Sequence, residues 1–407
     1  MQSIIAYILN NKFCLLLAIC FVSSVVVPIS YNQMPYVLGL LLLGANQLSN
    51  NRQMGSPIFL LFIVILIVGG VVNLCFSSRL FLFLFVLIIS SGMLYSEQNF
   101  NFRVNLFSVI LDVVFVVNIL NIYCYFAGIN YYVNVWLGWQ NYFSGLAPHP
   151  MWLAVVSGVA NVANVHRLFV ANSVKWRVVY ALLVLLTLFL QFTAGSRAGL
   201  LATAMAVLVY FRTYFRDMSS VVLITAFSCI VIYALLPMLM SDASLLTEKI
   251  EEQDMENNSR NELWAARINE FLMSPIFGVG FARGYVDGVL VEGRLETGNG
   301  WLAVLSQTGI FAFICVATLV LSVLRNISAK WLPQKGLFFA IFIFLCVHSC
   351  FEGYLYTSFY MPCLLFWLLL GILLQAPNAD EVEFVDDDEI SETDEFESDD
   401  ESTTSEL

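Results

Sequence analysis

Long apolar runs separated by short polar connections occupy most of the chain. The runs are about 15–25 residues long and lack the alternation of barrel strands, so they predict α-helices that cross a hydrocarbon core roughly 30 Å thick. We expect an all-α, polytopic membrane helix bundle of about twelve transmembrane helices. The expected spans are approximately 13–30, 35–48, 57–75, 80–95, 104–126, 150–166, 178–193, 198–211, 220–240, 299–324, 336–352 and 358–375.

One connection differs from the others because it is long and polar. Residues 241–298 separate the ninth and tenth expected spans and carry most of the charge between apolar runs. We expect the chemistry in this loop. The chain then divides into helices one to nine (1–240), a large catalytic loop (241–298), helices ten to twelve (299–376) and an acidic tail (377–407).

Composition supports a membrane protein, and the net charge is concentrated at one end. The chain is 59% hydrophobic and only 12% charged, whereas soluble domains carry roughly 25% charged residues. The net charge of −12 comes from the tail, because residues 380–406 hold 15 acidic residues and no Lys or Arg. We expect this tail to be disordered, either simply solvated or a docking segment for a basic partner. Nothing in the chain predicts nucleic-acid binding.

Lysine and arginine in the short connections predict the orientation. With the N-terminus inside, eleven basic residues fall on the inner side and two on the outer side. The inner set is Lys12, Arg52, Arg103, Arg167, Lys175, Arg177, Arg212, Arg216, Arg325, Lys330 and Lys335, and the outer set is Arg79 and Arg197. Both termini are therefore expected in the cytoplasm and the long loop outside. The first run lacks a small-x-small cleavage site, so we interpret it as an anchor.

Two segments could bind an anion at the outer face. Arg197 stands at the start of the eighth expected span, either extending to lipid phosphate or binding an anion beside a helix N-terminus. Further along, a predicted helix that ends at Pro275 places Arg260, Trp264 and Arg267 on one face. This helix either lies on the bilayer surface or directs its arginines at the same anion as Arg197.

The residues after this helix could bring backbone close to a ligand. Gly278 and Gly280 form a glycine-rich turn. Asn299 and Trp301 follow at the outer entry to the tenth span, where a tryptophan is also typical of an interfacial anchor.

Four motifs in order carry a resemblance to a known family. They are Ser196-Arg197-Ala198, Arg260 with Trp264, Pro275-Ile276-Phe277-Gly278-Val279-Gly280, and Asn299 with Leu302 and Gly309. Their order and spacing, over about residues 190–315, resemble the O-antigen ligase and polymerase superfamily. These are bacterial membrane glycosyltransferases that act on polyprenyl-diphosphate-linked glycans.

The resemblance implies a reaction, its partners and a location. The donor would be an undecaprenyl-diphosphate-linked glycan, and an acceptor glycan would receive the sugar of an O-antigen or another surface polysaccharide. The bilayer and a chain-length regulator would be further partners, and no metal or cofactor is expected. The location would be the bacterial inner membrane. Arg197 and Arg260 would be catalytic, and Arg267, Trp264, Gly278, Gly280, Asn299 and Trp301 would bind substrate.

One departure bears on the choice between polymerase and ligase. The family's ligases carry a histidine before the asparagine, where this chain has Gly298. Because a positioned base contributes typically 10²–10⁴-fold, the departure favours a polymerase. His149 and Glu352 could replace that base, and Glu296 is a weaker candidate.

A transporter or lipid-glycan flippase is the alternative from another class. Asp112 lies near the middle of the fifth span and must be paired, protonated or directed at a polar cavity. It would serve as the coupling residue of a transporter. Transporters, however, usually show related halves and broken helices, and the sequence indicates neither.

Overall fold

The computed structural model describes residues 2–26, 33–49, 53–54, 56–90, 94–131, 142–214, 258–286, 288–293, 298–330, 332 and 334–378. These residues are mostly helical. The helices are α1 (Gln2–Val22), α2 (Met34–Ser49), α3 (Pro57–Val72), α4 (Ser78–Ser90), α5 (Glu97–Phe126), α6 (Pro150–Val170), α7 (Val174–Thr193), α8 (Arg197–Tyr214), α11 (Asn258–Met273), α12 (Gly300–Asn326), α13 (Lys335–His348) and α14 (Met361–Gln375). Two short antiparallel pairs join β1 (Gln53–Met54) to β2 (Leu94–Tyr95) and β3 (Arg283–Val286) to β4 (Val289–Glu292).

Eleven of the twelve expected spans coincide with a helix, and the ninth, 220–240, lies outside the described residues. Several boundaries differ from the expected spans: α1 begins well before residue 13, α4 ends at Ser90 rather than at 95, and α5 begins at Glu97 rather than at 104. Within the described residues, five helices are long and apolar enough to cross a membrane, and five more are apolar but shorter. The chain is therefore an all-α membrane protein.

Local signals set several helix starts. Ser96 accepts a hydrogen bond from the Asn99 amide at the start of α5, and Glu97 occupies the first turn. His149 caps α6 and is followed by Pro150 at the first helical position. These arrangements satisfy amide groups that the first turn of a helix leaves without a partner.

The centre of the bundle is α14, whose residues from Met361 to Leu373 are buried. Trp367 stacks on Phe62 of α3 and meets Phe83 of α4 edge to face. Helix α13 packs against α14 and also contacts α8 and α6. Because this apolar core is closely packed, it fixes the helix ends from which the peripheral loops extend.

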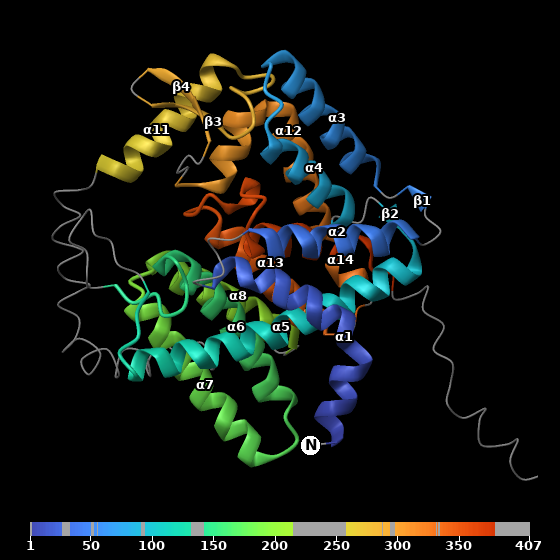
Figure 1. Ribbon diagram of the computed structural model, residues 1–407, viewed down its shortest axis with the longest axis vertical. Coiled ribbons are helices and arrows are strands. Elements are labelled where there is room, and N and C mark those ends of the chain that lie inside the picture. The colour runs from blue at the N-terminus through green and yellow to red at the C-terminus, as the bar shows by residue number, and fades with distance from the viewer. Residues whose placement is uncertain are drawn as a thin grey trace, which may run out of the picture.

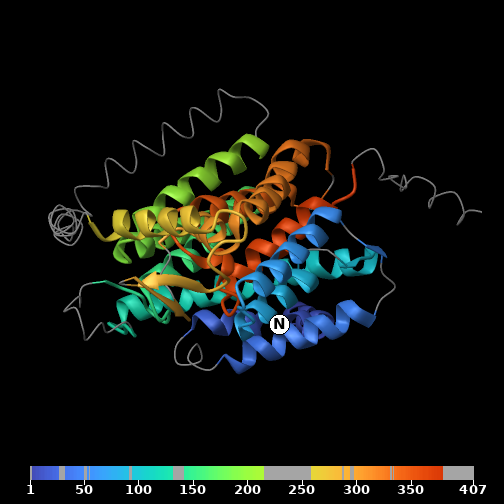
Figure 2. The same cartoon turned by 90° about the horizontal axis from the view of Figure 1, so that it is seen from above.

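The structure gathers distant loops at one end. Figure 1 shows α11 and the β3–β4 hairpin at the same end as α3 and α12, with α6 and α7 toward the other. Seen from above, α11 and the hairpin lie over the bundle (Figure 2). We call residues 258–286 and 288–293, together with the first four turns of α12, the loop assembly. It contains most of the predicted site.

Candidate functional site

The loop assembly is built around a break in α12. Inside this helix Gly309 has φ 78° and ψ −176°, which is not helical and belongs to a region that essentially only glycine adopts. The segment 275–280, which we call the glycine turn, fits against this break. A Cβ on Gly309 would lie 2.1 Å from the Ile276 carbonyl oxygen, and one on Gly278 would lie 2.3 Å from the Gln307 carbonyl carbon. Both positions therefore require glycine.

The turn and the helix exchange hydrogen bonds. In an unbroken helix the Ile310 amide would donate to Ser306; here it donates to the Pro275 carbonyl at 2.8 Å. The freed Ser306 carbonyl accepts from the Val279 amide at 2.9 Å, and the Gln307 carbonyl accepts from the Gly280 amide at 3.1 Å. The glycine turn thus supplies partners that the broken helix lacks, as buried backbone groups require.

A strap from the hairpin holds the assembly to α3 and α4. Arg283 pairs with Glu292 across the hairpin and donates to the backbone carbonyls of Asn73 (2.8 Å) and Leu74 (3.3 Å). The Cys75 thiol also contacts the Phe281 carbonyl at 3.4 Å. These contacts fix the position of the hairpin relative to the turn between α3 and α4.

Helix α11 ends just before Pro275, as the sequence predicts, and it carries two of the motif residues. Trp264 donates from its indole nitrogen to the Gly298 carbonyl at 3.1 Å, so it ties α11 to the residue before α12. Gly298 has φ +60°. Arg260 lies in the first turn of α11, and its side chain lies outside the described residues.

Arg267 forms a buried ion pair. Its guanidinium lies 2.9 Å from the Glu270 carboxylate, and both side chains are 2% exposed. The other Glu270 oxygen accepts from the Tyr285 amide at 2.7 Å. Burial raises the pKa of Glu270 and lowers that of Arg267. This arrangement directs Arg267 toward the inside of the loop assembly, where it joins α11 to the hairpin.

Asn299 and Trp301 shape the start of α12. The Asn299 side chain caps the helix by accepting from the amides of Trp301 (2.9 Å) and Leu302 (3.0 Å). The Trp301 indole donates to the Cys346 carbonyl at 3.2 Å, which directs its ring into the bundle. In the structure these two residues position α12.

The remaining predicted residues occupy separate helix ends. Arg197 is the exposed first residue of α8, where the Ser196 hydroxyl accepts from the Gly199 amide. His149 accepts from the Met151 amide at 3.2 Å. Glu352 is buried and follows Ser349, whose carbonyl accepts from the Gly300 amide at 2.7 Å. Glu352 is thus held beside the first turn of α12.

Comparison with known families decides the relationship. Residues 182–317 match the family described as O-antigen ligase. This match supports the resemblance of the chain to the O-antigen ligase and polymerase superfamily. Members of this superfamily are membrane glycosyltransferase-like enzymes. No curated protein sequence matches the chain.

The superfamily segment covers the whole loop assembly. It begins in α7, contains the Arg197 turn, α11 and the glycine turn, and ends in α12 after the break. Gly278 and Gly309 occur in two separate motifs of the resemblance, and the structure joins them in one contact. Spacing along the chain alone could not predict that contact.

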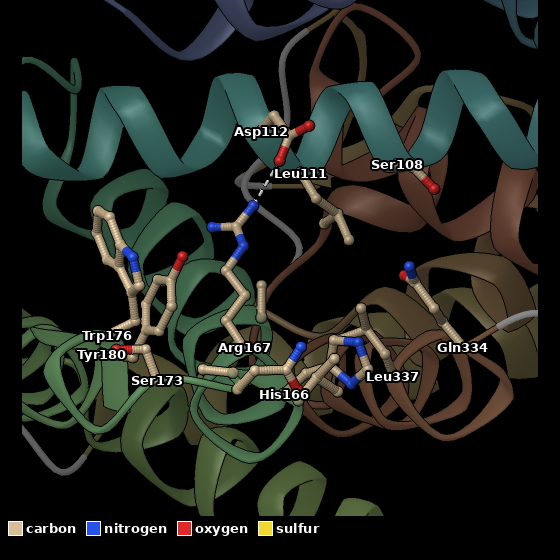
Figure 3. A pocket seen from close by; sticks show the side chains of 14 residues that line it. Ser108, Leu111, Asp112, His166, Arg167, Ser173, Trp176, Tyr180, Gln334 and Leu337 are labelled. Atoms are coloured by element: carbon tan, nitrogen blue, oxygen red, sulfur yellow. Dashed lines mark hydrogen bonds and ion pairs between the residues drawn. The ribbon is translucent and has the colours of Figure 1, made fainter. Parts of the chain in front are cut away.

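A larger cavity lies elsewhere, between α5, the end of α6 and the start of α7. Its volume is about 550 Å³. Figure 3 shows Arg167 extending toward Asp112, with Trp176 and Tyr180 at one side. The Arg167–Asp112 distance is 2.5 Å, and the Tyr7 hydroxyl donates to the other Asp112 oxygen at 2.6 Å. Asp112 is therefore paired, which is one of the three environments that the sequence predicts for it.

Sequence reasoning missed two residues of the loop assembly and misread one helix. Glu270 stands three residues after Arg267, a spacing that places both side chains on one helix face and could have predicted the pair. Gln307 gave no signal, because its role depends on the break. The expectation of unbroken helices was wrong, since α12 breaks at Gly309.

Proposed function

We propose that this chain is a surface-polysaccharide polymerase at the outer face of the bacterial inner membrane. The acceptor sugar hydroxyl attacks the anomeric carbon of a glycan on undecaprenyl diphosphate. The bond from that carbon to the diphosphate oxygen breaks, and the electron pair leaves on the diphosphate. The hydroxyl proton passes to Glu352 or His149. Charge develops on the leaving diphosphate, so donors fixed around it lower the barrier.

The observation that carries this proposal is the convergence of three of the four superfamily motifs at the loop assembly. Gly278 contacts the break beside Gly309, and Trp264 is bonded to Gly298. A ligand-binding surface needs donors held by rigid neighbours, and interlocked backbone provides such support. We propose that Arg197 and Arg260 bind the diphosphate and that Arg267 acts through Glu270 as a positioning residue.

The same interlocked backbone is the basis for the substrate-binding roles that we propose for the other motif residues. Trp264, Asn299 and Trp301 fix the start of α12, and the backbone of Gly278 and Gly280 stands close to it. We propose that the glycan contacts this surface through backbone groups and the exposed faces of these side chains.

Twelve spans with an outer 241–298 loop are part of the proposal. It is supported by contacts between connections that are expected on the same side of the membrane. Arg283 reaches the α3–α4 turn, and the start of α12 contacts the end of α13. At the other end, Asn99 of α5 donates to Gln47 of α2.

The choice of polymerase rests on position 298. The residue there is glycine at φ +60°, so no side chain can act as the base. The alternative is an O-antigen ligase that joins polysaccharide to lipid-A core or to protein, and the family match is compatible with both enzymes. Deletion in a native host separates the two. Loss of a polymerase leaves single repeat units on the core, whereas loss of a ligase leaves unattached lipid-linked polymer.

A transporter is less well supported. The break in α12 resembles the discontinuous helices of transporters, but Ser306 and Gln307 present their carbonyls to the glycine turn rather than to an open cavity. Asp112 is bonded to Arg167 and Tyr7.

In vitro transfer tests the proposal directly. Purified protein in lipid nanodiscs receives a synthetic undecaprenyl-diphosphate repeat unit, with and without chelator, and products are sized by gel and mass spectrometry. We expect polymer in both conditions. Arg197→Ala and Arg260→Ala should each reduce the rate by about 10²-fold or more, and Arg→Lys should restore it only in part.

Arg325→Ala is the matched control, because Arg325 is exposed at the last turn of α12. Its transfer rate should equal that of the wild type. Unchanged transfer by both alanine variants, or no transfer by the wild type, would contradict the proposal.

A further inference from the structure

A second, smaller cavity lies beneath the loop assembly. Its volume is about 110 Å³. It is bounded by the start of α4, the first turns of α12, the base of the hairpin and the connection from α13 to α14. We call it the small pocket. Its size suits one compact group rather than a whole glycan, since pockets for drug-sized ligands are about 300–1,000 Å³.

Arg79 is the charged residue that lines this pocket. It is half-buried in the first turn of α4. Its backbone carbonyl accepts from the Ser358 hydroxyl, but its guanidinium has no hydrogen bond or ion pair within the described part of the chain. A guanidinium carries five donors, and those of a half-buried arginine that lines a pocket are available to a ligand. An anionic ligand would satisfy them.

Gln307 of α12 supplies a second donor to the lining. Its side chain is 4% exposed, and its oxygen accepts from the Ala282 amide at 3.0 Å. Because an amide hydrogen needs an acceptor, this bond fixes the orientation of the carboxamide. The Gln307 NH₂ group then remains as a donor without a partner among the described residues, in a side chain that lines the pocket.

Two acidic residues stand next to lining residues but do not themselves line the pocket: Glu352, which is buried beside Gly353, and Glu292. Glu292, next to the lining residue Gly293, is paired with Arg283. The other polar lining groups are hydroxyls and amides, including Thr357, whose hydroxyl donates to the Gly353 carbonyl. The described lining thus combines a cation, a buried amide donor and no carboxylate.

We propose that the small pocket binds a phosphoryl group through Arg79 and the Gln307 NH₂. The inference rests on the proposed function for its source, which is the diphosphate of the lipid carrier. It adds a third arginine to the two of the superfamily motifs, supplied by a helix outside the segment 182–317. Arg79 would hold one phosphoryl group while the hairpin covers it.

Binding of defined probes tests the site without relying on transfer. Farnesyl diphosphate and inorganic diphosphate are titrated against the full-length protein in nanodiscs by calorimetry. We expect Arg79→Ala to weaken binding about 10- to 100-fold, as loss of a hydrogen bond to a charged group predicts. Arg79→Lys should restore part of it.

Gln307→Glu is the sharper variant. Glutamate keeps an oxygen for the Ala282 amide but replaces the NH₂ donor with a second oxygen, so the fold is preserved and the ligand is repelled. We expect at least as large a loss as with Arg79→Ala. Arg325→Ala is the control, and thermal unfolding of each variant reports folding.

Each outcome decides a point. Weakening of farnesyl diphosphate alone assigns the site to the lipid carrier, and equal weakening of both probes assigns it to free diphosphate. Unchanged affinity for both probes in Arg79→Ala overturns the proposal, whatever Gln307→Glu does. If wild-type protein transfers no sugar but its probe binding depends on Arg79, the proposed function fails while this site stands.

Discussion

Two arginine–carboxylate pairs in this protein occupy very different surroundings. Arg267 and Glu270, in the loop assembly, are each 2% exposed. Arg167 and Asp112, in the helix bundle, are 22% and 48% exposed and line a cavity of about 550 Å³. The loop outside the expected spans is therefore packed more tightly around its ion pair than the bundle is. The polar sequence of the loop assembly therefore forms a closely packed structure.

The reason lies in backbone as much as in side chains. The loop assembly is held by exchanged hydrogen bonds between the glycine turn and α12, which cannot form unless the two segments are in register. The Arg167 pair depends on side chains alone, with Arg167 also stacked over Phe115 at 4.4 Å. We therefore expect a single substitution to destabilise the whole loop assembly, whereas a substitution at the Arg167–Asp112 pair should have only a local effect.

Breaking the glycine turn should have the largest effect. In Gly309→Ala the new methyl group would meet the Ile276 carbonyl, so the turn must leave the break. Strain, overpacking and three lost hydrogen bonds together cost on the order of 5 kcal/mol. Thermal unfolding in detergent and in vitro transfer measure the loss.

Gly288→Ala is the control for that experiment. Gly288 also has positive φ, but no atom lies within 4 Å of the point that its new methyl group would occupy, so only about 1–2 kcal/mol of backbone strain is expected. Equal losses in the two variants would mean that backbone conformation, and not the contact with α12, decides stability.

Removing one partner of the buried pair should have the next largest effect. Arg267→Met leaves the Glu270 carboxylate buried without its cation, at a cost of about 3–5 kcal/mol near neutral pH. Burial already raises the pKa of Glu270, and loss of Arg267 raises it further. A raised folded-state pKa gives stability that is present below the unfolded value of about 4.3 and lost as pH rises through the folded value.

The unfolding midpoint of Arg267→Met should therefore rise relative to wild type as pH falls toward about 4. The double variant Arg267→Met/Glu270→Gln should lose this pH dependence and recover most of the stability, because no charge remains buried. A single variant whose deficit is the same at every pH would show that the pair acts only by packing.

Loss of the Trp264 bond should cost less. Trp264→Phe keeps an aromatic ring and removes the donor to the Gly298 carbonyl, which is worth about 1 kcal/mol. Because that bond positions Gly298, which lies just before α12, we expect a clear fall in the rate of transfer and only a small fall in the unfolding midpoint. The reverse pattern would make Trp264 purely a packing residue.

The smallest effect is expected at the exposed pair. Asp112→Asn keeps hydrogen-bonding oxygen and nitrogen near Arg167 and Tyr7 and removes a charge that is about half exposed. Because this pair lines an open cavity rather than a packed interior, we expect a smaller loss of stability than in Arg267→Met, and thermal unfolding in detergent measures the change. A loss comparable to that of Arg267→Met would show that the two pairs do not differ as their exposure indicates.

Sequence pattern predicted the helices well because period and length are local properties. The helix over Asn258–Met273 and the starts of α8 and α12 were anticipated from caps, apolar runs and prolines. The resemblance to the superfamily was predicted from the motifs and is confirmed over residues 182–317. These inferences needed only neighbours along the chain.

The interior of the site depended on contacts that no local pattern contains. The role of Gly309 becomes apparent only when the turn around Gly278 is beside it, 31 residues earlier in the chain. Asn299 and His149 proved to be helix caps in the structure, a role that their residue types allow but do not require. The convergence of Arg197 and Arg260 on one diphosphate stays a prediction.

The break in α12 has a consequence for biogenesis. The ribosome delivers residues 275–280 before it delivers 306–310, and domains generally form in that order. When the later segment enters the membrane, the backbone that must complement it already exists. A chain permuted so that α12 emerged first would present carbonyls of Ser306 and Gln307 to lipid with nothing to receive them.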